Sequence, residues 1–288
     1  MYSNSKLWLY ENCPEAYKIK YIDKTFPDLP KSIHAFLGSA VHDALEFLYV
    51  ELMKGEILDL DAVIEHFAKG WHDGYATDIR VPVGEKVENF FNKGVKFLID
   101  YYQGNLPFSK ETIGIEKKIY FPIDEGIFII GYIDRIEKHE DGSYEVHDYK
   151  TSNSMKSQVE VDFDRQLAFY HMGLQDLFGT DARVKLTWHF LAHNRKIHSF
   201  RNQEQLDKLK AETLALIEKI RNTKEWPACG KQFCDWCSYK ATHGVAVKSN
   251  DGEARNSGAE LGEKVGGGGK EYGSRKVFTL NDSLGKWL

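Results

Sequence analysis

Apolar residues recur at helical spacing through the first third of the chain. In residues 38–54 they stand three or four positions apart, at Val41, Leu45, Leu48 and Leu52. This spacing places them on one face of a helix. Residues 61–75 and 85–102 have a similar pattern. The first 110 residues are therefore predicted to be mostly helical.

The hydrophobic period changes after residue 111. Residues 113–122, 127–137 and 144–150 predict three strands, with turn signals at residues 124–126 and 141–142. Further along, residues 162–178 predict a helix, 183–193 a buried strand, 196–200 a short partner strand and 204–221 an amphipathic helix. This order of elements predicts an α/β fold, in which helices flank a mixed central sheet.

The chain changes character again at residue 244. Ten of its 24 glycines lie in residues 244–288, which favours a flexible linker. The tail ends in an apolar peptide, residues 277–288, whose alternatives are a partner-binding segment and a strand folded onto the body. Asn281, Leu284, Trp287 and Leu288 loosely resemble a sliding-clamp-binding peptide, although the first position lacks the usual Gln. We therefore expect a body over 1–243, with parts 1–110, 111–200 and 201–243, and a tail over 244–288.

Composition favours a soluble intracellular protein. Hydrophobic residues make up 42% of the chain, enough for a globular core, and no apolar run reaches the roughly 18 residues of a membrane span. The N-terminus lacks the layout of a signal peptide. A cytoplasmic location is expected, of viral or cellular origin, and the oligomeric state is not constrained.

The net charge of −5 argues against a general nucleic-acid coat protein but allows a local basic groove. Candidates for such a groove are Lys6, Lys18, Lys20, Lys117, Lys118, Lys156 and Arg165.

Two carboxylates and an ammonium are predicted to converge on neighbouring strands. Asp148 and Lys150 point to the same face because side chains alternate along a strand. The turn at residues 140–143 folds this strand against the preceding one and brings Asp134 close. Such a set can hold Mg²⁺ or Mn²⁺ and place a Lys beside a water or phosphate. A surface Asp/Lys pair is the alternative, but the apolar neighbours Ile133 and Val146 indicate at least half-buried strands.

The four cysteines predict a second metal site. Cys234 and Cys237 form a Cys-x-x-Cys pair, Cys229 precedes them, and Cys13 lies more than 200 residues away. Metal binding is favoured over disulfides in an intracellular protein, and zinc suits four thiolates. A metal held by all four would tie the two ends of the body together.

Six segments, in order, resemble a PD-(D/E)XK nuclease of the RecB-like branch, which includes CRISPR-associated exonucleases and the AddB nuclease domain. The opening segment has its lone Cys13, and the Gly-x-x-x-His-x-x-Leu-Glu helix is matched by residues 38–46. The metal motifs are matched by residues 131–135 and 148–150, the Gln-x-x-x-Tyr helix by residues 166–170, and the cluster motif by residues 234–237. The resemblance implies a restriction-endonuclease-like core and covers residues 3–243.

The resemblance also implies the roles of the site residues. His42, Asp134, Asp148 and the backbone carbonyl of Tyr149 would bind Mg²⁺ or Mn²⁺, with Lys150, Gln166 and Tyr170 acting beside them on the water, the phosphate or a base. Glu46 is left unassigned, and Glu116 is a possible neighbouring acid. The cysteines would hold a 4Fe-4S cluster, with structural zinc as the alternative. The family places a further Cys where this chain has His243, so Cys229 and His243 are alternative fourth ligands.

The expected function is a metal-dependent DNA exonuclease that acts on single strands or ends, in recombination, repair, replication or CRISPR-type processing. The alternative is a non-catalytic DNA- or partner-binding module of the same fold. The complete set of predicted site residues favours the enzyme. The sequence contains no Gly-x-x-x-x-Gly-Lys-Ser/Thr phosphate loop, so unwinding would need another protein.

Overall fold

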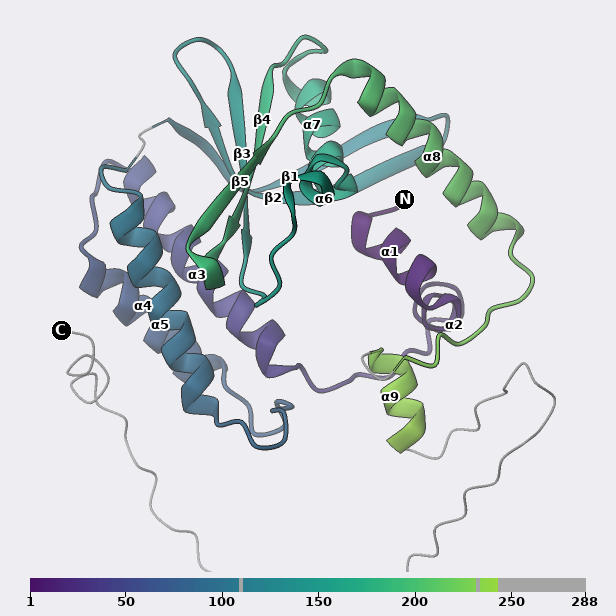
Figure 1. Ribbon diagram of the computed structural model, residues 1–288, viewed down its shortest axis with the longest axis horizontal. Helices are drawn as coiled ribbons and strands as arrows, with labels where there is room; N and C mark the ends of the chain where they lie inside the picture. The colour runs from purple at the N-terminus through teal and green to yellow at the C-terminus, as the bar shows by residue number, and fades with distance from the viewer. Residues whose placement is uncertain (109–110, 232–233, 243–288) are drawn as a thin grey trace, which may run out of the picture. The chain divides into compact units, whose positions relative to one another are not determined.

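The computed structural model describes residues 1–108, 111–231 and 234–242 (Figure 1). Its first structural unit spans Met1–Tyr239 and contains the sheet and the sites discussed below. Residues 243–288, which include His243 and the predicted tail peptide, lie outside the described residues.

Helices form the N-terminal part, as predicted. They are α1 (Asn4–Asn12), α2 (Pro14–Tyr17), the π-helix η1 (Lys18–Asp23), α3 (Ile33–Met53), α4 (Leu60–Gly74) and α5 (Val87–Gly104). Helices α3, α4 and α5 pack together through fully buried side chains such as Leu45, Phe67 and Leu98, so their apolar faces have the partner that an amphipathic helix requires.

A five-stranded sheet follows, in the order β1-β2-β3-β4-β5. Its strands are β1 (Thr112–Asp124), β2 (Ile127–Lys138), β3 (Tyr144–Lys150), β4 (Val184–Phe190) and β5 (Arg195–Ser199). Only β3 and β4 pair in parallel; the other neighbours are antiparallel. Parallel strands need a crossover connection, and here α6 (Gln158–Asp162) and α7 (Arg165–Phe178) supply it.

Helices cover both faces of this sheet, as Figure 1 shows. Val146 and Leu186 face a core shared with α7 and with α8 (Gln203–Asn222). The Tyr149 side chain on β3 points to the opposite face of the sheet and belongs to the core with α3, α4 and α5. The predicted mixed α/β architecture is therefore confirmed.

Two predicted boundaries differ from the structure. The helix predicted over 162–178 begins three residues later, at Arg165, because Asp164 caps it by accepting the Leu167 N–H at 3.0 Å. Asp162 instead ends the separate helix α6. The strand predicted over 183–193 ends at Phe190, where Leu191–His193 form a 3₁₀ turn. Asn194 then takes a left-handed conformation (φ 46°) that returns the chain along β5.

Close packing sets the position of α7 over the sheet. A Cβ on Gly173 would lie 2.8 Å from Ile119 Cδ1 and 2.9 Å from its Cβ. Gly173→Ala should therefore lower the free energy of unfolding by about 1–3 kcal/mol through overpacking, measured by urea denaturation. Gly70→Ala in α4 is the matched control, since its nearest neighbour would be 3.6 Å away, and it should be stabilising by up to about 1 kcal/mol. Equal effects of the two substitutions would contradict this account.

Candidate active site

The ladder between β2 and β3 stops just before the two predicted metal-binding aspartates. Its last pair is Arg135 with His147. The next N–H on β3, that of Tyr149, donates instead to Asp134 Oδ2 at 2.7 Å. Because the carboxylate replaces a strand partner, the two strands separate without leaving a buried donor unpaired. Asp134 and Asp148 then face the same side of the sheet.

The Asp134 carboxylate is mostly removed from water, which makes its negative charge unfavourable. Burial raises its pKa well above the usual range, and the neighbouring charge of Asp148 raises it further. Asp148 is itself only 2% exposed. Two buried carboxylates side by side favour a bound cation or a retained proton.

Lys150 offsets part of this negative charge. Its Nζ lies 2.6 Å from Asp148 Oδ2. Burial alone would lower the pKa of Lys150, but attraction to Asp148 and then Asp134 raises it above the usual value. The side chain also lies over the Trp188 ring, with Nζ 5.0 Å from the centroid. The structure thus keeps a positively charged Lys at the predicted position.

Helix α7 brings Gln166 and Tyr170 into contact with Asp148. Gln166 Nε2 donates to Asp148 Oδ1 at 3.1 Å, and the Tyr170 hydroxyl donates to the same oxygen at 3.2 Å. Gln166 Oε1 also accepts from Lys150 Nζ at 3.2 Å. The two α7 residues lie one helical turn apart, so a single helix face orients both Asp148 and Lys150.

Helix α3 supplies His42. Its Nε2 donates to the Tyr149 carbonyl at 2.8 Å, and its Nδ1 lies 3.6 Å from Asp134 Oδ2. Burial lowers the pKa of the imidazole, which favours the neutral form that ligates metals. His42, the Tyr149 carbonyl and Asp134 are therefore together, as predicted.

Glu116 is nearer to this site than the sequence indicated. It lies on β1 between the register pairs Ile115–Arg135 and Lys117–Ile133, and therefore beside Asp134. Its φ of 45° is rare for a residue with a side chain. Burial raises the Glu116 pKa, and the charge of Glu46 raises it further. No sequence pattern marks such a backbone conformation.

A small cavity lies beside His42, Glu116 and Asp134. Its volume is about 10 Å³, roughly the space that one water or ion occupies. It is lined by His42, Leu45, Glu46, Tyr49, Ile115, Glu116, Asp134, Arg135 and Tyr149. Ligand atoms of His42, Glu116 and Asp134 lie within 4.8 Å of one another. The donor set, with its excess of carboxylates, fits one hard divalent cation.

Arg135 holds the strands from the other face of the sheet. Its Nε donates to the Tyr149 hydroxyl at 3.0 Å, and its guanidinium lies 4.0 Å from the centroid of the Tyr49 ring. Arg135 also pairs with the buried Glu137. It fixes the backbone that carries Asp134 and the Tyr149 carbonyl, a role that sequence reasoning missed.

The four cysteines meet in one place. Their Sγ atoms all lie within 4.8 Å of one another, and those of Cys229 and Cys237 are 3.6 Å apart. The N-terminal part of this cluster is further fixed by Trp236, whose Nε1 donates to Glu15 Oε2 at 2.7 Å. A single tetrahedral ion with Zn–S bonds of about 2.3 Å would place its sulfurs about 3.8 Å apart. The four thiols therefore fit one metal ion as they stand.

Three of the seven basic residues predicted to form a groove are paired with acids. Lys18 pairs with Asp23, Lys156 with Asp164, and Arg165 with Glu11. Lys6 lies over the Tyr2 and Tyr21 rings. Of the predicted groove residues, Lys20 lines a cleft, which is considered below.

A comparison with protein families identifies the chain. The model of the PD-(D/E)XK nuclease superfamily matches residues 2–242. The chain belongs to this superfamily. The superfamily uses divalent metals and acts on nucleic acids, and the convergence of His42, Asp134, Asp148 and Lys150 agrees with that membership.

The chain is also similar to two individual proteins. It is 28% identical over 217 residues to the "Gene 69 protein" of Mycobacterium phage D29, covering 62% of this chain and 71% of that protein. A crystal structure of a "Putative exonuclease" from Eubacterium rectale is 13% identical, with a TM-score of 0.47 over 82% of this chain and 86% of that one. Within the described part of the chain, no helix combines the length and apolar character needed to cross a membrane.

The raised pKa of Asp134 has a consequence for stability. Between the unfolded pKa and the raised folded pKa, the folded protein binds the extra proton, so stability falls as the pH rises through this window. Above it, ionised Asp134 destabilises the metal-free protein. Asp134→Asn should therefore raise the urea midpoint at pH 7 in the presence of chelator, while removing most of the stabilisation that Mn²⁺ gives to the wild type.

Asp141→Asn is the control for this prediction. The Ser143 hydroxyl and backbone N–H lower the Asp141 pKa in the exposed hairpin turn, so the loss of this charge should not stabilise the protein. A lower midpoint for Asp134→Asn than for the wild type in chelator would contradict the charge argument.

Proposed function

We propose that this nuclease-superfamily chain is a metal-dependent DNA exonuclease that acts on single strands or DNA ends. The observation that carries the proposal is the convergence of three separate elements on β3. Helix α3 brings His42, helix α7 brings Gln166, and β2 brings Asp134 to the strand that holds Asp148 and Lys150. Such an activity suits recombination, repair, replication or CRISPR-type processing, the settings of the RecB-like branch.

Mg²⁺ or Mn²⁺ would be held by Asp134, Asp148, His42 and the Tyr149 carbonyl, with Glu116 beside them. When bound, it would supply an activated water and neutralise charge on the phosphate. Imidazole ligation favours Mn²⁺ over Mg²⁺.

The protein's own groups would orient the reacting atoms. Lys150, held in its charged form beside Asp148, would orient the water or offset charge that develops on the phosphate. Gln166 would hold Lys150 and Asp148 in a fixed relative position through its two amide contacts. The Tyr170 ring is only 4% exposed, so its hydroxyl would position Asp148 rather than its ring stack on a base.

Lys150→Ala should reduce cleavage by about 10²-fold or more, because removing one preorganised charge at a reacting centre has that effect. The assay uses end-labelled single- and double-stranded DNA with Mg²⁺, Mn²⁺, Ca²⁺ or chelator. Activity is expected with Mg²⁺ and Mn²⁺ only, since Ca²⁺ prefers more ligands at longer distances. A closed single-stranded circle should survive if the enzyme requires an end.

Lys138→Ala, at the exposed end of β2, is the control and should cleave like the wild type. Full activity of Lys150→Ala would sink the assignment of this site. Retained DNA binding without cleavage by the wild type under every metal condition would favour the non-catalytic module.

We further propose a structural metal centre formed by Cys13, Cys229, Cys234 and Cys237. The resemblance to RecB-like nucleases favours a 4Fe-4S cluster, whereas the close sulfur spacing favours one zinc ion. A four-iron cluster has iron and sulfide between its thiolates, so the sulfurs would have to move apart to hold it. Either metal would link Cys13 to the segment around residue 234 and close a very long loop.

Cys229→Ser should release the metal and lower the melting temperature, because three thiolates hold it less well and the long loop is no longer closed. Metal analysis and the visible spectrum of anaerobically purified protein distinguish about four irons per chain from one zinc. His243→Ala is the matched variant. If it released the metal while Cys229→Ser did not, His243 would be the fourth ligand.

A further inference from the structure

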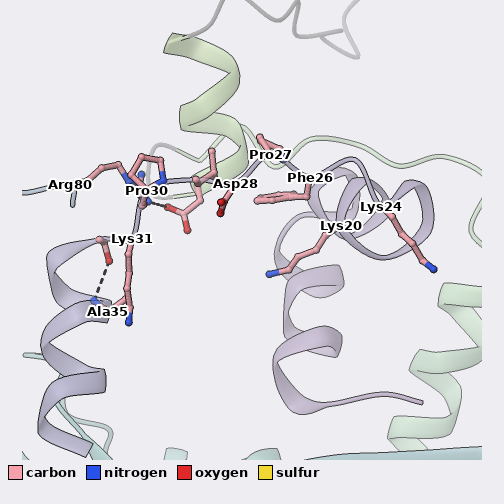
Figure 2. A pocket seen from close by; sticks show the side chains of 12 residues that line it. Lys20, Lys24, Phe26, Pro27, Asp28, Pro30, Lys31, Ala35 and Arg80 are labelled. Carbon is pink, nitrogen blue, oxygen red and sulfur yellow. Dashed lines mark hydrogen bonds and ion pairs between the residues drawn. The ribbon is translucent and has the colours of Figure 1, made fainter. Parts of the chain in front are cut away.

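A basic cleft lies beside the start of α3 (Figure 2). Its volume is about 590 Å³. The end of η1, the following linker and the first turn of α3 form most of its wall, and Arg80 and Asp235 complete it. These elements belong to the first structural unit, and the cleft is separate from the small cavity at the predicted metal ligands.

Two lysines face each other across this cleft. Figure 2 shows Lys20 and Lys31 on opposite sides of the gap, with Lys24 pointing away from both. Within the described residues, Lys20 and Lys31 have no carboxylate partner, whereas Lys18 on the same π-helix pairs with Asp23 at 2.6 Å. Lys31 Nζ donates only to Ser39 Oγ, at 2.8 Å. Both ammonium groups therefore remain available to an anion.

Arg80 forms the frame of the cleft. Its Nε donates to the Pro30 carbonyl at 2.9 Å, and its NH2 group donates to Asp235 Oδ1 at 2.8 Å. These contacts connect the linker with the start of α9 (Asp235–Thr242). The position of Lys31, one residue after Pro30, is thereby fixed.

Phe26 adds an aromatic surface to the same wall. The centroid of its ring lies 5.7 Å from the centroid of the Trp236 ring and 5.6 Å from Lys20 Nζ. Lysines next to a partly exposed aromatic ring form the combination that binds single strands, because the lysines contact phosphates and the ring stacks on a base.

Helix α3 connects the cleft to the proposed active site. Ala35 lines the cleft, and His42 lies seven residues later, about 10 Å along the helix axis. Lys31 contacts this helix at Ser39, and a Cβ on Gly38 would lie 3.2 Å from Thr151 Oγ1, next to Lys150. A strand of a few nucleotides could span this distance.

We propose that the cleft binds the single-stranded DNA substrate a few nucleotides from the phosphate that is cleaved. Lys20 and Lys31 contact its phosphates, and Phe26 stacks on a base. The inference rests on the proposed nuclease function. Asp28, which also lines the cleft, opposes the phosphates and limits the affinity.

The binding test uses the full chain carrying Lys150→Ala, so that the DNA is not cut, and a labelled single-stranded oligonucleotide. Lys20→Gln with Lys31→Gln should weaken binding roughly 10- to 30-fold near 0.1 M salt and reduce the salt slope by about 1.4, because each phosphate contact to a single strand contributes about 0.7. Phe26→Leu, which keeps an apolar side chain next to Trp236, should weaken it about 10-fold. Asp28→Asn should tighten it.

Lys18→Gln is the matched control, since this lysine lies on the same π-helix but is paired, and it should bind like the parent protein. Circular dichroism and melting temperature check that each variant is folded. An unchanged affinity and salt slope for Lys20→Gln with Lys31→Gln would overturn the proposal. An acidic peptide can be tested as a competitor of the DNA. If the double variant lost affinity for the peptide as much as for the DNA, the cleft would be assigned to a protein partner and the proposal would be overturned as well.

Kinetics separate this proposal from the proposed function. A small nitrophenyl phosphodiester of thymidine reaches only the metal ligands, so its hydrolysis by the Lys20/Lys31 variant should equal that of the wild type, while KM for the oligonucleotide rises about 10-fold or more. No hydrolysis of either substrate by the wild type, with binding still dependent on the cleft, would reject the nuclease function and retain the cleft. If the Lys20/Lys31 variant lost activity equally on both substrates, the proposed role of the cleft would be overturned.

Discussion

The hydrogen bond from the Tyr149 N–H to the Asp134 carboxylate is the interaction on which the proposed active site depends. It occupies the place of a ladder bond at the point where β2 and β3 separate. Without it, separation would leave a buried donor unpaired, which costs about 1–3 kcal/mol. With it, Asp134 is fixed beside Asp148, and the Tyr149 carbonyl stays within reach of His42. Arg135 supports the same peptide from the opposite face through the Tyr149 hydroxyl. Replacing one sheet hydrogen bond with a carboxylate contact thus brings the proposed metal ligands together.

The helix layers on the two faces of the sheet contribute different functions. Helix α3 brings a neutral imidazole toward the carboxylates, and helix α7 brings amide and hydroxyl groups that restrain Asp148 and Lys150. Both helices approach closely at a glycine, Gly38 near Thr151 and Gly173 against Ile119. Distances between groups on separate elements are therefore set by backbone packing, which is stiffer than side-chain rotation. The raised pKa of Asp134 is the electrostatic consequence, because this packing holds two carboxylates, Asp134 and Asp148, close together in a buried place.

Much of this arrangement could be predicted from the sequence, because the two strands and two helices carry local patterns. Alternation along β3 placed Asp148 and Lys150 on one face, and the hairpin turn placed Asp134 beside them. Glu116 could not be placed in this way, since its left-handed backbone has no marker in a strand of ordinary composition. The cleft was missed for another reason. Lys31 and Arg80 are 49 residues apart in the sequence, yet the Arg80 N–H donates to the Lys31 carbonyl at 3.0 Å, and no local pattern marks this pairing. Charge alone also did not indicate that Lys156 and Arg165 pair with acids, or that Lys156 lies over the same Trp188 ring as Lys150.

The cysteine cluster and the basic cleft are physically connected. Asp235, which binds Arg80, stands directly between Cys234 and the Trp236 that packs on Phe26. The Arg80–Asp235 pair is exposed, and exposed ion pairs contribute only about 0–1 kcal/mol. It therefore cannot by itself hold the start of α9 against the linker. A metal ion or cluster bound by the four cysteines, as proposed, would close a loop of more than 200 residues and contribute far more. The position of α9 against Phe26 would consequently depend on the proposed metal centre. Lys31 is held in addition by the Arg80 N–H, which donates to its carbonyl at 3.0 Å, and Asp134 and Asp148 depend on the sheet.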